Sequence, residues 1–310
     1  MNLAAPDVRT LEIHAPAFDC LTTSCRRPAN PRGRELATPL LIQAIRDAAE
    51  LGYNFLSIAG EQSVFHPDLK ALCREAHRMH MLTTLTTRCG LLSARRLKSL
   101  APSIDLLGIR FEAGMARNLE PVRRSRIPFA LVFHLTAENM GELEQTAAFA
   151  STHGAVMLHV IPAEALADHE MATLWMMMEC LRDMHRGELA VQLDVWNRYN
   201  LPMDIKNLEE WRKGLKTGER FVGELVSPLV VEEDGTVSPL RQGFPRELSM
   251  GNLAHSALAE IGAAWIRDGA GLFGEVYRTA LGEARLFDDL SRLIAAEARR
   301  HGRASFSAAG

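Results

Sequence analysis

Short apolar runs rich in Val, Ile, Leu and Phe alternate along this chain with longer segments whose apolar residues recur at helical spacing. This alternation is typical of parallel strands covered by amphipathic helices, because such strands are buried on both faces. The predicted strands are 11–14, 54–61, 82–87, 105–113, 129–136, 155–160 and 188–194. We therefore expect an α/β fold built around a parallel sheet.

Helices are predicted between these strands, with recognisable ends. They are 39–52, one that begins near residue 67, 140–152 and 172–185. Gly52 and Gly154 suit helix ends because glycine adopts the left-handed conformation found there, and Asn139 is a residue type that caps helix starts. The strand and helix order predicts repeated strand–helix units.

The pattern changes beyond about Gly214. Residues 224–240 alternate as a hairpin, and Asp234-Gly235 supplies its tight turn. Residues 287–300 have the pattern of an amphipathic helix, and the small, polar residues 302–310 are expected to be disordered. We therefore expect a first region, 1–213, and a smaller C-terminal α+β region, 214–310.

These segments, in this order and spacing, resemble the radical S-adenosylmethionine (SAM) family over most of the chain. The second strand runs into Gly60-Glu61, where that family has a Gly-Gly-Glu-Pro turn, and the fourth strand reaches Arg110. The resemblance implies a partial (β/α)6 TIM-like barrel over 1–213. It also implies that 214–310 corresponds to the small SPASM/twitch-like auxiliary domain that many members carry.

The chain departs from the family at the residues that carry its chemistry. A Cys-x3-Cys-x2-Cys loop holds the family's [4Fe–4S] cluster, whereas this chain has Cys20-x4-Cys25 and no third cysteine in register. The turn reads Gly60-Glu61-Gln62-Ser63. Arg110 takes the place of a small hydroxyl residue, and Leu240 stands where an auxiliary cluster cysteine would be. No cysteine follows Cys180, so the sequence excludes an auxiliary cluster in the C-terminal region.

Side chains at the carboxyl ends of parallel strands converge on one cavity, and several candidate site residues fall there. For a cofactor these are Gly60, Glu61, Arg110 and Glu112. Arg110 and Glu112 lie two residues apart and would either form an ion pair that fills the cavity, our preferred interpretation, or bind a ligand carboxylate or phosphate. The candidate metal ligands are Cys20, Cys25, Cys89, His134 and His159, which suit zinc or an iron–sulfur cluster; reduced, partly buried thiols are the simpler interpretation.

Other histidines carry weaker signals. His14 is either a cavity liner or a satisfied core histidine. Cys73, His77 and His80 share one helix face, but His80 falls at the helix end and His77 is expected to be solvated. Arg123, Arg124 and Arg126 are expected in a solvated connecting loop, so nucleic-acid binding is not predicted.

Composition agrees with a water-soluble protein. The 310 residues are 47% hydrophobic with a net charge of −3, and the five cysteines do not form a disulfide framework. No segment is long and apolar enough for a membrane span, and the N-terminus does not read as a signal peptide. We therefore expect a cytoplasmic protein without a membrane partner.

Two functions are consistent with these observations. The first is a radical-SAM-like protein that holds no cofactor and serves as a non-radical substrate-binding or partner subunit in a biosynthetic or peptide-tailoring pathway. Its partners would be a peptide or small-molecule ligand, a catalytic protein or a second copy of itself. The second is an enzyme that uses the barrel mouth with an atypical Cys/His metal site, an iron–sulfur cluster or cluster-free SAM.

Overall fold

A computed structural model gives the fold of the chain. It describes residues 8–14, 36–60, 63–163, 166–195, 213–214, 217, 222–239, 249–284 and 288–307. Cys20, Cys25 and Glu61, three of the predicted site residues, lie outside this part of the chain.

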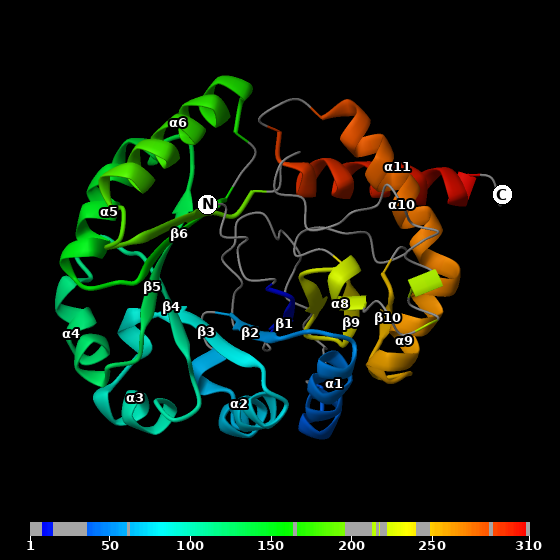
Figure 1. Ribbon diagram of the computed structural model, residues 1–310, viewed down its shortest axis with the longest axis horizontal. Coiled ribbons are helices and arrows are strands. Elements are labelled where there is room, and N and C mark those ends of the chain that lie inside the picture. The colour runs from blue at the N-terminus through cyan, green and yellow to red at the C-terminus, as the bar shows by residue number, and fades with distance from the viewer. Residues whose placement is uncertain are drawn as a thin grey trace.

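The described strands form one ten-stranded sheet in the order β10-β9-β8-β1-β2-β3-β4-β5-β6-β7. The strands are β1 (Thr10–His14), β2 (Phe55–Ala59), β3 (Leu82–Arg88), β4 (Leu106–Arg110), β5 (Phe129–Leu135), β6 (Met157–Pro162), β7 (Ala190–Leu193), β8 (Leu229–Val231), β9 (Thr236–Ser238) and β10 (Gly251–Asn252). Neighbours from β8 through β1 to β7 are parallel, and β9 and β10 are antiparallel. The sheet curves into an open arc, so the predicted partial TIM-like barrel is confirmed (Figure 1).

Helices follow the strands of the barrel and cover the outer side of the arc (Figure 1). They are α1 (Thr38–Glu50), α2 (Leu69–Arg78), α3 (Ala94–Leu100), α4 (Ala116–Ser125), α5 (Leu143–Thr152) and α6 (Asp168–Met184), with short 3-10 turns at Ser63–Phe65, Cys89–Leu91 and Met140–Glu142. The strands bury their outward side chains under these helices. In β3, for example, Thr83, Leu85 and Thr87 are at most 1% exposed.

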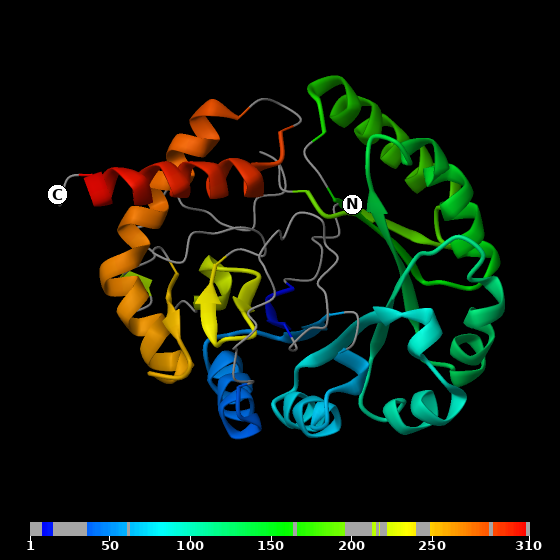
Figure 2. The same cartoon turned by 180° about the vertical axis from the view of Figure 1, so that it is seen from behind.

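The C-terminal region continues the barrel sheet. It contains α8 (Val222–Leu225), the β8–β9 hairpin, β10, α9 (Leu258–Ala264), a π-helical turn (Trp265–Gly269), α10 (Ala270–Glu283) and α11 (Leu290–Ser307). Figure 2 shows α9, α10 and α11 grouped at the end of the arc away from α3 to α6. Because β8 pairs in parallel with β1, the predicted hairpin becomes part of the barrel wall.

Specific contacts hold this region against the start of the barrel. The Tyr53 hydroxyl donates to the Val226 carbonyl at 2.7 Å, and the Gly223 amide donates to the Leu51 carbonyl at 2.8 Å. The buried Asp47 carboxylate of α1 accepts the Ala259 amide in the first turn of α9 at 3.2 Å. The division at residues 213 and 214 stays a prediction.

Three local expectations are wrong. Arg123 and Arg124 lie in the last turn of α4, and Arg126 is its left-handed cap rather than part of a loop. α11 continues to Ser307, well into the tail that the composition predicts to be disordered. The Asn139 side chain accepts the Thr136 amide and donates to the His134 carbonyl, so it braces the end of β5 without capping the next helix.

Candidate binding site at the mouth of the barrel

The inner face of the barrel sheet is polar and partly open to solvent. The strand registers from β3 to β7 place polar side chains on this face, and each of them is partly exposed or exposed: Thr84, Thr86, Arg88, Arg110, His134, His159 and Gln192. The outward side chains of the same strands are buried under the helices. The carboxyl-end half of this face, where Arg88, Arg110, His134 and His159 lie, is the candidate site.

An arginine that the sequence analysis missed lies at the centre of the mouth. Arg88 ends β3 beside Arg110, its register partner in β4. Arg88 Nε lies 3.4 Å from Oε1 of Glu112, and both side chains remain about two-fifths exposed, at 35% and 43%. An ion pair between Arg110 and Glu112 stays a prediction, whereas the pair between Glu112 and Arg88 joins two strand ends. The alternation along 82–88 would have placed Arg88 on the inner face.

His134 and His159 lie on the same inner face, on neighbouring strands. Burial comes first among the causes that lower the pKa of His134 to about 4, followed by the positive charge of Arg110 and then His159. His134 is therefore neutral at physiological pH. Nε2 of His159 lies 3.9 Å from the Asp194 carboxylate that follows β7. The charges of Arg110 and His159 both act on His134, and the role of these residues as a site stays a prediction.

Cys89 follows β3 directly and is only 2% exposed. Burial and then the negative charge of Glu112 raise the pKa of its thiol to about 11. Without a bound metal, the side chain is therefore a protonated thiol at neutral pH. Among the described residues, no group of three or more His, Cys, Asp or Glu side chains is arranged to hold a metal ion.

Cys89 is the cysteine that the described residues place at the mouth, so by themselves they do not supply the three thiolates of a radical SAM cluster. The contribution of Cys20, Cys25 and Glu61 stays a prediction. Gly60, the predicted cofactor residue at the end of β2, has φ of 122° and its carbonyl accepts the Ser63 amide at 3.1 Å. A side chain is strained at this φ, so the glycine is required for the turn that leaves β2.

A second charged group lies where β1 meets β8, and we call it the seam cluster: Glu12, His14 and Glu232. His14 Nε2 lies 2.9 Å from Glu12 Oε1, and Nδ1 lies 3.4 Å from Glu232 Oε2. Burial opposes the charged form of His14, but its bonds to the two carboxylates and their charges outweigh burial and raise the pKa to about 10. His14 is therefore a cation between two anions.

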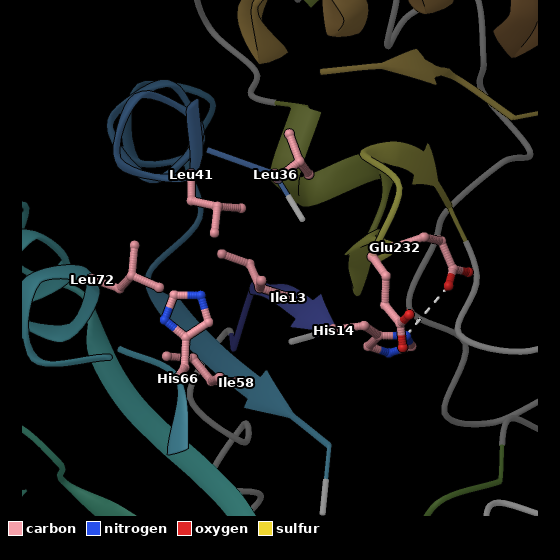
Figure 3. A pocket seen from close by; sticks show the side chains of 9 residues that line it. Ile13, His14, Leu36, Leu41, Ile58, His66, Leu72 and Glu232 are labelled. Carbon is pink, nitrogen blue, oxygen red and sulfur yellow. Dashed lines mark ion pairs between the residues drawn. The ribbon is translucent and has the colours of Figure 1, made fainter. Parts of the chain in front are cut away.

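A pocket borders the seam cluster (Figure 3). His14 and Glu232 lie at one end, His66 lies on the opposite side, and Glu233 also lines the pocket. Apolar side chains from β1, β2, α1, α2 and a position two residues before α1 form the rest of the lining: Ile13, Leu36, Leu41, Ile58 and Leu72. His14 thus lines a cavity, one of the two interpretations that the sequence left open.

The histidines of α2 have structural roles. His80 has φ of 59° just after the end of α2, as expected for a residue at the helix terminus. His77 is one-third exposed, but its Nε2 is 2.9 Å from the Asp105 carboxylate, so it is bonded rather than simply solvated. Burial raises the pKa of Cys73 to about 12, and the nearby Asp105 adds to that effect. This end of the helix stabilises the base of the barrel.

The chain is similar in sequence to a peptide cyclase and in fold to proteins solved with S-adenosylmethionine, although no family model matches it. The chain is 28% identical over 180 residues to a PqqA peptide cyclase from Ruegeria pomeroyi. The aligned segment covers 52% of this chain and 48% of that protein. The chain therefore spans about half the length of this curated relative.

Two solved structures share the fold. SuiB of Streptococcus suis, bound to S-adenosylmethionine, has a TM-score of 0.58 and 13% identity, covering 86% of this chain and 67% of SuiB. anSMEcpe with bound AdoMet and a Cp18Cys peptide has a TM-score of 0.59 and 13% identity, covering 96% of this chain and 97% of anSMEcpe. SuiB has also been solved with its precursor peptide SuiA. These likenesses confirm the predicted radical SAM barrel at the level of fold.

No helix in the described part of the chain has the length and apolar character needed to cross a membrane.

Proposed function

We propose that this chain is a peptide-binding protein on the radical SAM barrel and acts as a non-radical substrate-binding or partner subunit in peptide tailoring. The observation that carries the proposal is the Cys20-x4-Cys25 spacing in a chain whose fold is that of SAM-binding, peptide-modifying enzymes. A cluster needs three correctly spaced thiolates to leave one iron open for SAM. The retained barrel without that triad favours recognition over radical chemistry.

The inner face supports a ligand of peptide character. Arg88, Arg110, His134 and Gln192 offer donors, and Glu112 and Asp194 offer acceptors, across a surface that remains partly exposed. Backbone amides and carbonyls of a peptide need donors and acceptors in alternation, which a mixed surface supplies. In this protein the face would bind and orient a peptide, and a partner enzyme or a second copy would supply the chemistry.

A second function is favoured by one observation. His134 and His159 lie on neighbouring strands near Arg110, and His134 is neutral, as a metal ligand must be. With Cys20 and Cys25 they would form the atypical metal site of an enzyme, and cluster-free SAM is the related alternative.

Anaerobic purification, followed by measurement of iron, sulfide and zinc per chain, separates the two functions. The C20A/C25A variant is the matched sample, and SAM itself is titrated calorimetrically into both proteins. We expect substoichiometric metal in wild type, no change on removing the two cysteines, and no SAM binding. Iron and sulfide at cluster stoichiometry, lost in C20A/C25A, would overturn the proposal. Zinc at one per chain, lost in the same variant, would establish the metal enzyme instead.

A further inference from the structure

The junction between β1 and β8 is short, although it connects the whole C-terminal hairpin to the barrel sheet. β8 has only three residues, Leu229–Val231, and it is the strand that joins the C-terminal hairpin to the barrel sheet. Its register pairs Glu12 with Val230 and Ile13 with Val231, so Glu232 follows beside His14. The seam cluster therefore lies at the carboxyl end of this short junction.

The cluster places one cation between two anions from different strands. A neutral imidazole has one donor and one acceptor nitrogen, whereas here both ring nitrogens face carboxylate oxygens. Only the imidazolium satisfies both. Without its charge, Glu12 and Glu232 would face each other across the seam, with side chains only 8% and 23% exposed. Glu233, which follows Glu232 and also lines the pocket, adds further negative charge.

We infer that His14 is a built-in cation that latches the C-terminal hairpin onto the first strand of the barrel. His14 places one positive charge between the two carboxylates, so part of the negative charge at the seam is balanced by the chain itself. The hairpin forms the barrel wall beside the mouth. The latch thus makes the shape of the mouth depend on one protonated side chain, independently of which ligand binds there.

A second ion pair joins the residue before β1 to α8 and provides a control. Arg9 Nη1 lies 3.6 Å from Glu224 Oε1, with side chains 20% and 23% exposed, close to the exposure of His14 and Glu232. In this pair the partner to be neutralised, Glu224, is an anion, so removing its charge creates no repulsion between carboxylates. Its loss should have little effect on the hairpin.

The latch is tested in the full-length chain by hydrogen–deuterium exchange at pH 7. The amides of β8 and β9 are measured against those of β5 in the centre of the barrel, which serve as the internal reference. The variants are H14Q, which removes the charge, H14K, which restores a cation, H14Q/E232Q, which also removes the facing anion, and the control E224Q.

We expect H14Q to speed exchange in β8 and β9 about tenfold, the size expected for loss of a charged hydrogen bond, with β5 unchanged. H14K and H14Q/E232Q should recover most of the protection, and E224Q should resemble wild type. Unchanged exchange in H14Q would overturn the latch. Equal loss in H14K and H14Q would also overturn it, because the imidazole shape and not its charge would then matter. If H14Q also speeds exchange in β5, the substitution destabilises the whole protein. The latch would then be supported only if H14Q/E232Q restores the protection of β5, β8 and β9.

Discussion

Two histidines at different places on the barrel have their pKa values shifted in opposite directions. In the seam cluster the pKa of His14 is raised to about 10, whereas at the mouth the pKa of His134 is lowered to about 4. Burial favours the neutral form at both places. The neighbours decide the result, because two carboxylates surround His14 and the charge of Arg110 lies near His134. One histidine is a cation held between carboxylates and the other is a neutral polar group.

Replacing each histidine with leucine gives the largest contrast. H14L removes the imidazolium that faces two buried or half-buried carboxylates, and we expect a loss of about 2–3 kcal/mol in the free energy of unfolding. H134L removes a neutral ring for which burial, and no hydrogen bond, dominates the pKa, so we expect a change within about 0.5 kcal/mol. Urea unfolding measures both. Equal losses in the two variants would remove the distinction between the sites.

Close packing on the inner face provides the next test. A Cβ added at Gly108 would lie 2.8 Å from Thr86 Oγ1 on the neighbouring strand. We expect G108A to cost about 1–3 kcal/mol through overpacking. The double variant G108A/T86A should recover most of that stability, because the clashing hydroxyl is gone. If the effects of G108A and T86A on the free energy of unfolding simply add, the two side chains do not clash and the inner face is less tightly packed than the 2.8 Å distance implies.

The two histidines also predict opposite dependences of stability on pH. His14 binds its proton more tightly when folded, so its contribution is complete below its ordinary pKa of 6.5 and is lost as the pH rises through about 10. Glu12, Glu232, Glu233 and His66 are the titratable groups that face it or share its pocket. Chemical unfolding of wild type and H14Q from pH 6 to 10.5 should show a difference that shrinks with rising pH.

His134 acts in the other direction. Its folded pKa lies below 6.5, so its contribution is present above that pH and is lost as the pH falls through about 4. The difference between wild type and H134L should therefore change only on the acidic side. A change above pH 7 would contradict the assignment of a neutral His134.

The smallest expected effect is spectroscopic. R110M removes the charge that comes second, after burial, among the causes of the low pKa of His134. We expect that pKa, followed by histidine NMR, to rise while staying below 6.5, because burial remains. R117M, on the exposed side of α4, is the control and should leave it unchanged. If R110M does not move the pKa, Arg110 is not close to His134 in solution.

Much of the barrel could be predicted from the pattern of apolar residues. The predicted strands at 82–87 and 129–136 match β3 and β5 to within one residue, and the hairpin turn at Asp234-Gly235 lies between β8 and β9. Periodicity determines these elements locally, because strand and helix spacing differ. The polar ends of the strands could be predicted for the same reason, although Arg88 was passed over.

The partners of those polar residues depend on which strands lie side by side. The sequence places His14 and Glu232 more than two hundred positions apart, and only the parallel pairing of β1 with β8 brings them to 3.4 Å. Likewise Glu112 meets Arg88 across the β3–β4 pair. The chain by itself determined the elements and the unusual cysteine spacing. The tertiary structure decided which histidine carries a charge, because a pKa depends on neighbours that distant segments supply.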